Sequence, residues 1–284
     1  MILDLPKSPL RVATVQTSSV RGDVPANVAT VTRLVHEAAR QGARVTLFPE
    51  KILTGYEPAL IASDPARYAV TETDPRLSPI ADACRATGTA AVVGAAVADD
   101  AQLLISALVF GPDGHVLGRA DKQHLFASEV STYVAGESAC TFELDGWHLG
   151  LGICYDSGFP EHARAAAVDG CHAYLVGALF GRGGGERQYR TWFPARAIDN
   201  TIYSVLANHV GPAGEWDAAG GSGVWGPYGE VVAQAPSAGE AVVCADLDPG
   251  EIARVRAELT MLRDLAAGPG PGPGVGVGAR RRLR

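Results

Sequence analysis

Apolar residues in the first half of the chain alternate between runs typical of strands and spacings typical of helices. The segment 11–17 is rich in β-branched residues, and Asp23 precedes a stretch in which apolar residues recur at helical spacing as far as Gly42. A short apolar run at 44–48, a helix-like segment near 76–86 and an apolar strand at 90–97 follow. This alternation predicts an α/β fold with a largely wound sheet.

Predicted hairpins interrupt the alternation of strands and helices. The apolar segments 103–110 and 115–120 flank the turn residues 112–114, and the segments 141–144 and 147–153 flank Asp145 and Gly146. Beyond residue 154 the pattern predicts a helix at 160–169, a strand at 172–178, a helix at 187–199 and a strand at 202–209. Short hairpin strands then continue to about 246, and a last helix is predicted at 250–263. The sheets are therefore expected to be mixed.

Composition favours one large folded domain. The 284 residues are 47% hydrophobic and 19% charged, which excludes wholesale disorder, and no apolar run approaches the roughly 20 residues of a membrane span. We predict a domain at 1–265 and a flexible, Gly/Pro-rich tail at 266–284. The net charge of -7 argues against a nucleic-acid partner, because the one dense basic cluster is Arg280 to Arg284.

The amino-terminal residues and the cysteines predict a cytoplasmic protein. Asp4, Pro6 and Lys7 interrupt the opening segment before an apolar core of signal-peptide length can form. The cysteines are odd in number and contain no CxxC pair, which fits neither a disulfide framework nor a zinc cage. They are Cys84, Cys140, Cys154, Cys171 and Cys244. We expect them to be reduced thiols.

Three reactive side chains stand where apolar segments end. Cys154 follows the strand 147–153, and backbone N–H groups at a helix start can stabilise a thiolate and then an oxyanion. Glu50 closes the run LFPE, and Lys122 follows the hairpin strand. Taken singly, these residues fit a small buried hydrophobe, a loop acid and a solvated lysine. Together they suggest an active site at the ends of strands.

These segments resemble the nitrilase (carbon-nitrogen hydrolase) superfamily, whose catalytic set is Glu, Lys and Cys. Its three signatures appear in the family's order as LFPE with Glu50, DKQHLF with Lys122 and GICYDSGFPE with Cys154. The resemblance extends over roughly residues 9–263 and includes YVAGE at 133–137 and ARAIDNTIYSVLANHVG at 195–211. It implies a four-layer α-β-β-α sandwich and a homodimer. It also implies a supporting second glutamate, for which Glu129 has the right place; the alternative is an exposed loop carboxylate.

The implied activity is hydrolysis of a C–N bond in a small amide or carbamoyl compound, with no metal or organic cofactor. Cys154 would be the nucleophile and Glu50 the general base. Lys122 would stabilise the oxyanion, together with the backbone N–H of Tyr155. The product would be an acid, released after hydrolysis of a thioester.

The segment CYDSGFPE looks more like the amidase-type branches of the superfamily than the true nitrilases. An amide substrate is therefore favoured over a nitrile. Ser157 and Gly158 replace the bulky and basic pair of the related form CYDLRFPE, so an arginine that reads a substrate carboxylate is in doubt. The candidate substrate-binding residues besides Tyr155 are Tyr56, Phe180, Arg182, Glu186 and Trp192. A flexible glycine-rich loop, or core packing of the aromatic residues, is the alternative.

Other hydrolase classes have weaker support. The seven histidines form no HxH or HExxH motif, so a zinc site is not indicated. The segment GGSGV around Ser222 lacks the second glycine of GxSxG, and GLGICY does not complete GxGxxG. Three alternatives on the same fold stay open, namely a nitrile hydrolase, an acyl transferase and a catalytically inactive binding protein.

Overall fold

A computed structural model describes residues 4–266 of the chain. Five strands of the first half and the late strand β14 build a six-stranded sheet in the order β14-β1-β2-β3-β4-β5, in which β1, β2 and β3 are parallel and the other pairs antiparallel. Its strands are β1 (Leu10–Gln16), β2 (Val45–Leu47), β3 (Ala90–Asp99), β4 (Gln102–Phe110), β5 (Val116–Asp121) and β14 (Ala241–Leu247). Its helices are α1 (Val24–Arg40), α2 (Pro58–Ser63), α3 (Pro65–Tyr68), the 3₁₀ turn η1 (Pro75–Leu77) and α4 (Ser78–Thr87).

The second half builds a matching sheet in the order β13-β12-β9-β8-β7-β6, with β7, β8 and β9 parallel. Its strands are β6 (Cys140–Leu144), β7 (Trp147–Ile153), β8 (Ala173–Ala178), β9 (Tyr203–Asn208), β12 (Gly223–Trp225) and β13 (Val231–Gln234). The strands β10 (Val210–Ala213) and β11 (Trp216–Ala219) form a separate ribbon. The remaining helices are the 3₁₀ turn η2 (Cys154–Gly158), α5 (Pro160–Val168), α6 (Gly184–Asn200), α7 (Pro249–Glu258) and α8 (Met261–Ala266).

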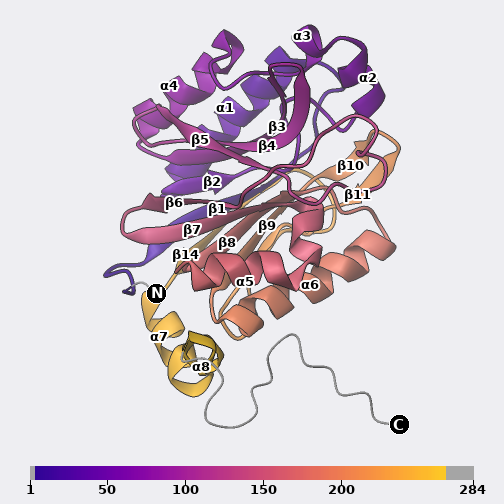
Figure 1. Cartoon of the computed structure of the whole chain (residues 1–284). Coiled ribbons are helices and arrows are strands. Elements are labelled where there is room, and N and C mark those ends of the chain that lie inside the picture. Colours follow the sequence, from indigo (N-terminus) through magenta and orange to yellow (C-terminus); the bar gives the residue numbers. More distant parts are fainter. Residues whose placement is uncertain (1–3, 267–284) are drawn as a thin grey trace, which may run out of the picture.

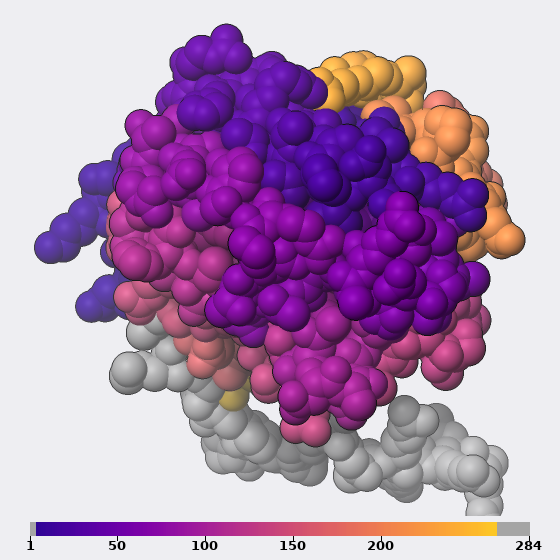
Figure 2. All heavy atoms as spheres, turned by 90° about the horizontal axis from the view of Figure 1, so that it is seen from above, coloured from indigo at the N-terminus to yellow at the C-terminus, as the bar shows by residue number. Residues whose placement is uncertain are grey.

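The two sheets lie face to face between two layers of helices. Helices α1 and α4 cover the outer face of the first sheet, and α5 and α6 cover that of the second (Figure 1). Seen from the side of α1 and α4, the surface is formed mainly by the first half of the chain, with C-terminal segments at one edge (Figure 2). The fold is thus the expected α-β-β-α sandwich.

Helix α1 shows how the sequence places a layer. The Asp23 side chain accepts a hydrogen bond from the Ala26 N–H at 3.0 Å, which caps the first turn, and Pro25 has a backbone angle suited to a helix start. The apolar residues recur every three or four positions and so form one buried face. That face consists of Val24, Val28, Val31, Leu34, Val35 and Ala38. Burial of each Val or Leu side chain contributes about 1.5–3 kcal/mol, which fixes the helix on the sheet.

The central strands are buried on both faces, which explains their unbroken apolar sequence. In β3, Val92 belongs to the cluster that also contains Leu149 of the second sheet. Its neighbour Val93 belongs to the cluster under α1 and α4, together with Val31 and Ile80. Successive side chains of one strand therefore serve two different cores.

The observed helices depart from the prediction after β2 and in the last predicted helix. The predicted helix 250–263 is two helices, because Leu259 takes an extended conformation with φ -102° and ψ 97°. The short helices α2 and α3, which begin at Pro58 and Pro65, lie in a connection where no helix was predicted. Of the predicted tail, residues 267–284 lie outside the described residues. Within residues 4–266, no helix is long and apolar enough to cross a membrane.

Candidate active site

Glu50 lies in the turn after β2, where its backbone is enclosed by strands of both sheets. A Cβ atom at Gly94 of β3 would lie 2.8 Å from the Glu50 Cα, and one at Gly177 of β8 would lie 3.2 Å from the Glu50 nitrogen. The ring Nε2 of His209 lies 2.6 Å from the Glu50 carbonyl oxygen. Two glycines therefore allow the close approach that brings the Glu50 side chain into the interior, where it is 1% exposed.

Lys122 follows β5 and joins two glutamates. Its Nζ donates to Glu50 Oε1 at 2.8 Å, and it lies 2.8 Å from Oε2 and 2.9 Å from Oε1 of Glu129. All three side chains are at most 1% exposed. Buried ion pairs require such close geometry, because each charge has lost its hydration.

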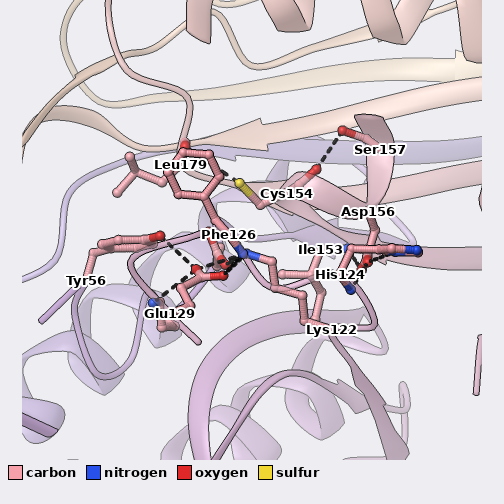
Figure 3. A network of polar contacts seen from close by, with 12 residues as sticks. Tyr56, Lys122, His124, Phe126, Glu129, Ile153, Cys154, Asp156, Ser157 and Leu179 are labelled. Atoms are coloured by element: carbon pink, nitrogen blue, oxygen red, sulfur yellow. Dashed lines mark hydrogen bonds and ion pairs between the residues drawn. The ribbon is translucent and has the colours of Figure 1, made fainter. Parts of the chain in front are cut away.

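The two glutamates differ in how fully their oxygens are bonded. Glu129 Oε1 also accepts from the Tyr56 hydroxyl at 2.7 Å, and its Oε2 accepts from the Phe126 N–H at 2.7 Å. In contrast, Glu50 Oε2 is buried and has no hydrogen-bond partner among the described residues. Glu129 is thus held as a carboxylate, and Glu50 keeps one oxygen free to take a proton. Figure 3 shows Tyr56 and Lys122 converging on Glu129.

Cys154 begins the 3₁₀ turn η2 at the end of β7. Its φ is +46°, a left-handed conformation that costs a non-glycine residue energy and is concentrated at functional sites. Its Sγ lies 3.6 Å from the Leu179 carbonyl oxygen (Figure 3). Tyr155 is the second residue of this turn, so its N–H has no acceptor within the helix and is available to a ligand.

Asp156 fastens the turn of Cys154 to the loop that carries Lys122. Its Oδ2 accepts from the Ile153 N–H at 3.0 Å, and its Oδ1 accepts from the His124 N–H at 2.9 Å. The carboxyl group is 1% exposed. Since Ile153 and His124 adjoin the nucleophile and the lysine, this one carboxyl group fixes the two segments relative to each other.

Burial has the largest influence on the titration of these groups. It raises the pKa of Glu50, although Lys122 opposes the rise. Burial also acts to raise the pKa of Glu129, but pairing with Lys122 and Lys51 outweighs it, and the pKa is lowered. Burial and the nearby Glu50 charge raise the pKa of the Cys154 thiol, so the thiol is protonated at neutral pH and needs a base. The pKa values of the two carboxylates are thus pushed apart, with that of Glu50 raised and that of Glu129 lowered.

A cavity of about 180 Å³ opens above the Cys154 sulfur. Most of its lining side chains are aromatic, and they come from segments far apart in the sequence. They are Tyr56, Phe126, Tyr155, Phe180, Trp192 and Trp216. A cavity with apolar walls and a few polar groups at its base is typical of small-molecule sites.

The family described as Carbon-nitrogen hydrolase matches residues 11–257. The chain belongs to this family. The human protein "Omega-amidase NIT2" is 31% identical over 260 residues, which cover 87% of this chain and 91% of the relative. The zebrafish (Danio rerio) omega-amidase is 32% identical over 269 residues, which cover 90% and 94%.

Solved structures of an amidase from Nesterenkonia sp. AN1 are similar to this carbon-nitrogen hydrolase. A mutant showing Michael addition of acrylamide at the active site cysteine has a TM-score of 0.77 at 30% identity, and covers 88% of this chain and 98% of its own. A mutant in complex with butyramide also has a TM-score of 0.77 at 30% identity, with 90% and 98% coverage. Another structure of this amidase is described as belonging to the nitrilase superfamily. The chain is therefore an amidase-like hydrolase of that superfamily.

Within this hydrolase, the structure gathers the predicted catalytic residues Glu50, Lys122, Glu129 and Cys154 in one buried site. Of the candidate substrate-binding residues, Tyr56, Tyr155, Phe180, Arg182 and Trp192 line the cavity. Glu186 is not among the lining residues. It lies in the first turn of α6 and pairs with Arg190 at 2.7 Å.

Sequence reasoning missed two polar residues that support the site. Lys51 is fully buried beside the glutamates, where its Nζ lies 3.6 Å from Glu129 Oε1. Asn208, at the end of β9, accepts from the Phe180 N–H at 2.8 Å and donates to the Phe180 carbonyl at 3.2 Å, which holds the cavity wall. The signal for Asn208 was present, because it stands at a strand end like the catalytic residues. Lys51 follows Glu50 directly and gave no signal of burial.

Proposed function

We propose that this hydrolase cleaves small amides through a Cys154 thioester, with Glu50 as the base and Lys122 as the oxyanion stabiliser, and releases ammonia. The observation that carries the proposal is the free, buried Oε2 of Glu50, whose other oxygen is bonded to Lys122. It is the one carboxylate oxygen of the cluster that is left to take the proton of the thiol.

In the first half-reaction, Glu50 takes the Cys154 proton as sulfur attacks the carbonyl carbon. The oxyanion accepts hydrogen bonds from Lys122 Nζ and the Tyr155 N–H. Two of the three Lys122 contacts go to the two oxygens of one Glu129 carboxylate. One N–H can therefore turn to the oxyanion while the ion pair with Glu129 is kept. Glu50 then passes its proton to the nitrogen, the C–N bond breaks, and ammonia leaves the thioester.

In the second half-reaction, water enters and Glu50 removes a proton from it. The hydroxide adds to the thioester carbonyl, and the intermediate collapses to the carboxylic acid with Cys154 as leaving group. Glu50 returns the proton to sulfur, which restores the starting state. No step requires a metal or an organic cofactor, and none of the described residues form a cluster of three metal-binding side chains.

The test is ammonia release and intact-protein mass spectrometry with butyramide as probe. Wild type should release ammonia and carry an acyl adduct under rapid quench, and Cys154→Ala should do neither. Glu50→Gln should bind the amide yet form no adduct. Cys140→Ala, a half-buried cysteine outside the site, is the matched control and should behave as wild type. Turnover by Cys154→Ala at the wild-type rate would remove the thioester mechanism.

The assembly and the location of the enzyme belong to the same proposal. We propose a cytoplasmic homodimer; the odd number of cysteines supports a reducing compartment, and the family resemblance supports the dimer. Light scattering of the purified protein measures the mass in solution and would contradict the dimer if it gave the mass of one chain.

A further inference from the structure

The walls of the cavity are aromatic and hold one another in place. Phe180 meets the Trp192 ring edge-on, with centroids 5.8 Å apart, and also packs against Tyr189 and Phe193 of α6. On the other side, the ring centroid of Phe126 lies 5.5 Å from that of Tyr155 in a T-shaped contact. Such interlocked rings give a rigid apolar surface that cannot solvate a charge.

The absence of a side chain at residue 158 creates part of this wall. A Cβ atom on Gly158 would lie 3.0 Å from Cη2 of Trp192, closer than the ordinary contact distance. Glycine therefore lets the Trp192 indole lie directly against the turn that carries Cys154. A side chain at this position would press on the indole and make it shift by a few tenths of an ångström.

The cations around the cavity are engaged elsewhere. Arg182 is the charged side chain in the lining, and its Nε donates to Asp217 Oδ2 at 2.9 Å, with the side chain 47% exposed to solvent. Lys122 and Lys51 lie against Glu50 and Glu129. Among the described lining residues, Arg182 is thus the one cation, and a second carboxylate on the substrate would have to compete with Asp217 for it.

A second carboxylate on the substrate would thus be buried among aromatic rings. An unpaired carboxylate loses its hydration on entering such a site, which costs free energy. An uncharged apolar acyl group of the same size has no charge hydration to lose, and it gains apolar contact with the rings.

We propose that the cavity selects amides whose acyl group is uncharged and apolar, branched alkyl or aryl, and rejects amides that carry a second carboxylate. Trp192 is the specificity-determining residue, and Gly158 makes room for it. This inference rests on the proposed function, since it assigns the substrate class of the same Cys154 site.

The test compares two amides of nearly equal shape, 4-methylpentanamide and succinamate, which differ in an isopropyl group against a carboxylate. Ammonia release gives kcat/KM for each. Wild type should prefer 4-methylpentanamide by about 100-fold or more. Equal efficiency, or a preference for succinamate, would overturn the inference. Absence of Cys154-dependent ammonia from both amides and from butyramide would instead remove the proposed function.

Substitutions in the cavity wall then identify the side chain that selects the substrate. Trp192→Ala should raise KM for 4-methylpentanamide about tenfold and leave kcat largely unchanged, because the lost contact binds ground state and transition state alike. Trp192→Phe should show a smaller rise and serves if the alanine variant does not fold. Tyr228→Ala, an aromatic truncation outside the cavity lining, is the matched control. A selective loss of succinamate turnover in Arg182→Gln would show that Arg182 reads a carboxylate and would overturn the inference.

Discussion

Lys51 offers a sharp test of how the buried charges set the activity. Its side chain is 0% exposed, and its Nζ lies 3.5 Å from the centroid of the Tyr56 ring and has no hydrogen-bond partner among the described residues. Burial lowers the pKa of Lys51, while the carboxylates of Glu50 and Glu129 oppose the fall and favour its ammonium form. The change Lys51→Met keeps an unbranched side chain of similar length and leaves the cluster with one negative charge in excess.

The size of the effect follows from the distance. Lys51 Nζ lies 3.6 Å from Glu129 Oε1. Coulomb's law at an effective dielectric constant of about 20 gives about 4.6 kcal/mol for two charges at that distance. This corresponds to about three pKa units, and it is an upper limit because Lys122 and Tyr56 still hold the carboxylate. The proton taken up in response should reside on Glu50, whose Oε2 is free.

The pH profile of kcat/KM for butyramide measures this shift. The base must be ionised, so the acidic limb of the profile reports the pKa of the coupled carboxylates. In Lys51→Met this limb should move upward by at least one unit. Besides the two glutamates, the ionisable groups near Lys51 are Lys122, Cys154, Tyr56, Tyr133 and His209.

Tyr133→Phe is the matched control. It alters a buried side chain over which Lys51 lies, with Nζ 4.9 Å from the ring centroid, and leaves every charge at neutral pH in place. Its acidic limb should coincide with that of wild type. If the limb of a folded Lys51→Met also coincided with wild type, Lys51 would be a packing residue and the charge argument would be refuted.

The free energy of unfolding gives a second test of the Lys51→Met change. The pKa of Glu50 in the folded protein lies above its usual value near 4.5. Glu50 therefore stabilises the folded state below pH 4.5, and this stability is lost as the pH rises through the folded pKa. Removal of the Lys51 charge raises the folded pKa of the pair further. Lys51→Met should therefore lose more unfolding free energy at pH 7 than at pH 5, measured by urea denaturation.

Two further predictions concern the backbone around Glu50. Gly94→Ala should unfold at a markedly lower temperature, because its Cβ would lie 2.5 Å from the backbone nitrogen of Lys51. An unchanged melting temperature would show that the turn can shift to make room for the methyl group. Burial lowers the pKa of His209 to about 4, so the stability it contributes is complete above about 6.5 and is lost as pH falls toward 4. The loss amounts to about 3 kcal/mol. His209→Asn should flatten the pH dependence of unfolding in that window, and an unchanged slope would contradict this assignment.

The sequence could predict that Glu50, Lys122 and Cys154 lie together, because each follows a segment whose pattern is plain. The apolar runs before Glu50 and Cys154 and the hairpin before Lys122 end at one edge of their sheets, where loops gather. The sequence could not show that Glu129 would be buried, because its partners Tyr56 and Phe126 come from loops without periodicity.

Glu186 shows how an error in a predicted helix boundary affects the prediction of a site residue. The helix was predicted to begin near 187 but begins at Gly184, so Glu186 lies inside its first turn. There the side chain is one helical turn from Arg190 and pairs with it. A shift of three residues in a helix start thus changes what a side chain faces, and propensity alone does not fix such boundaries.

The site and the core of this fold are built from the same contacts. A Cβ on Gly177 would lie 2.5 Å from the Phe48 carbonyl oxygen, so β8 of the second sheet presses on the turn of the first sheet that carries Glu50. In the proposed mechanism Glu50 must reach Cys154, and the close approach of the two sheets sets where Glu50 lies. Mutations that separate the sheets should therefore reduce activity before they unfold the chain, since a base displaced by about 1 Å already loses much of its rate.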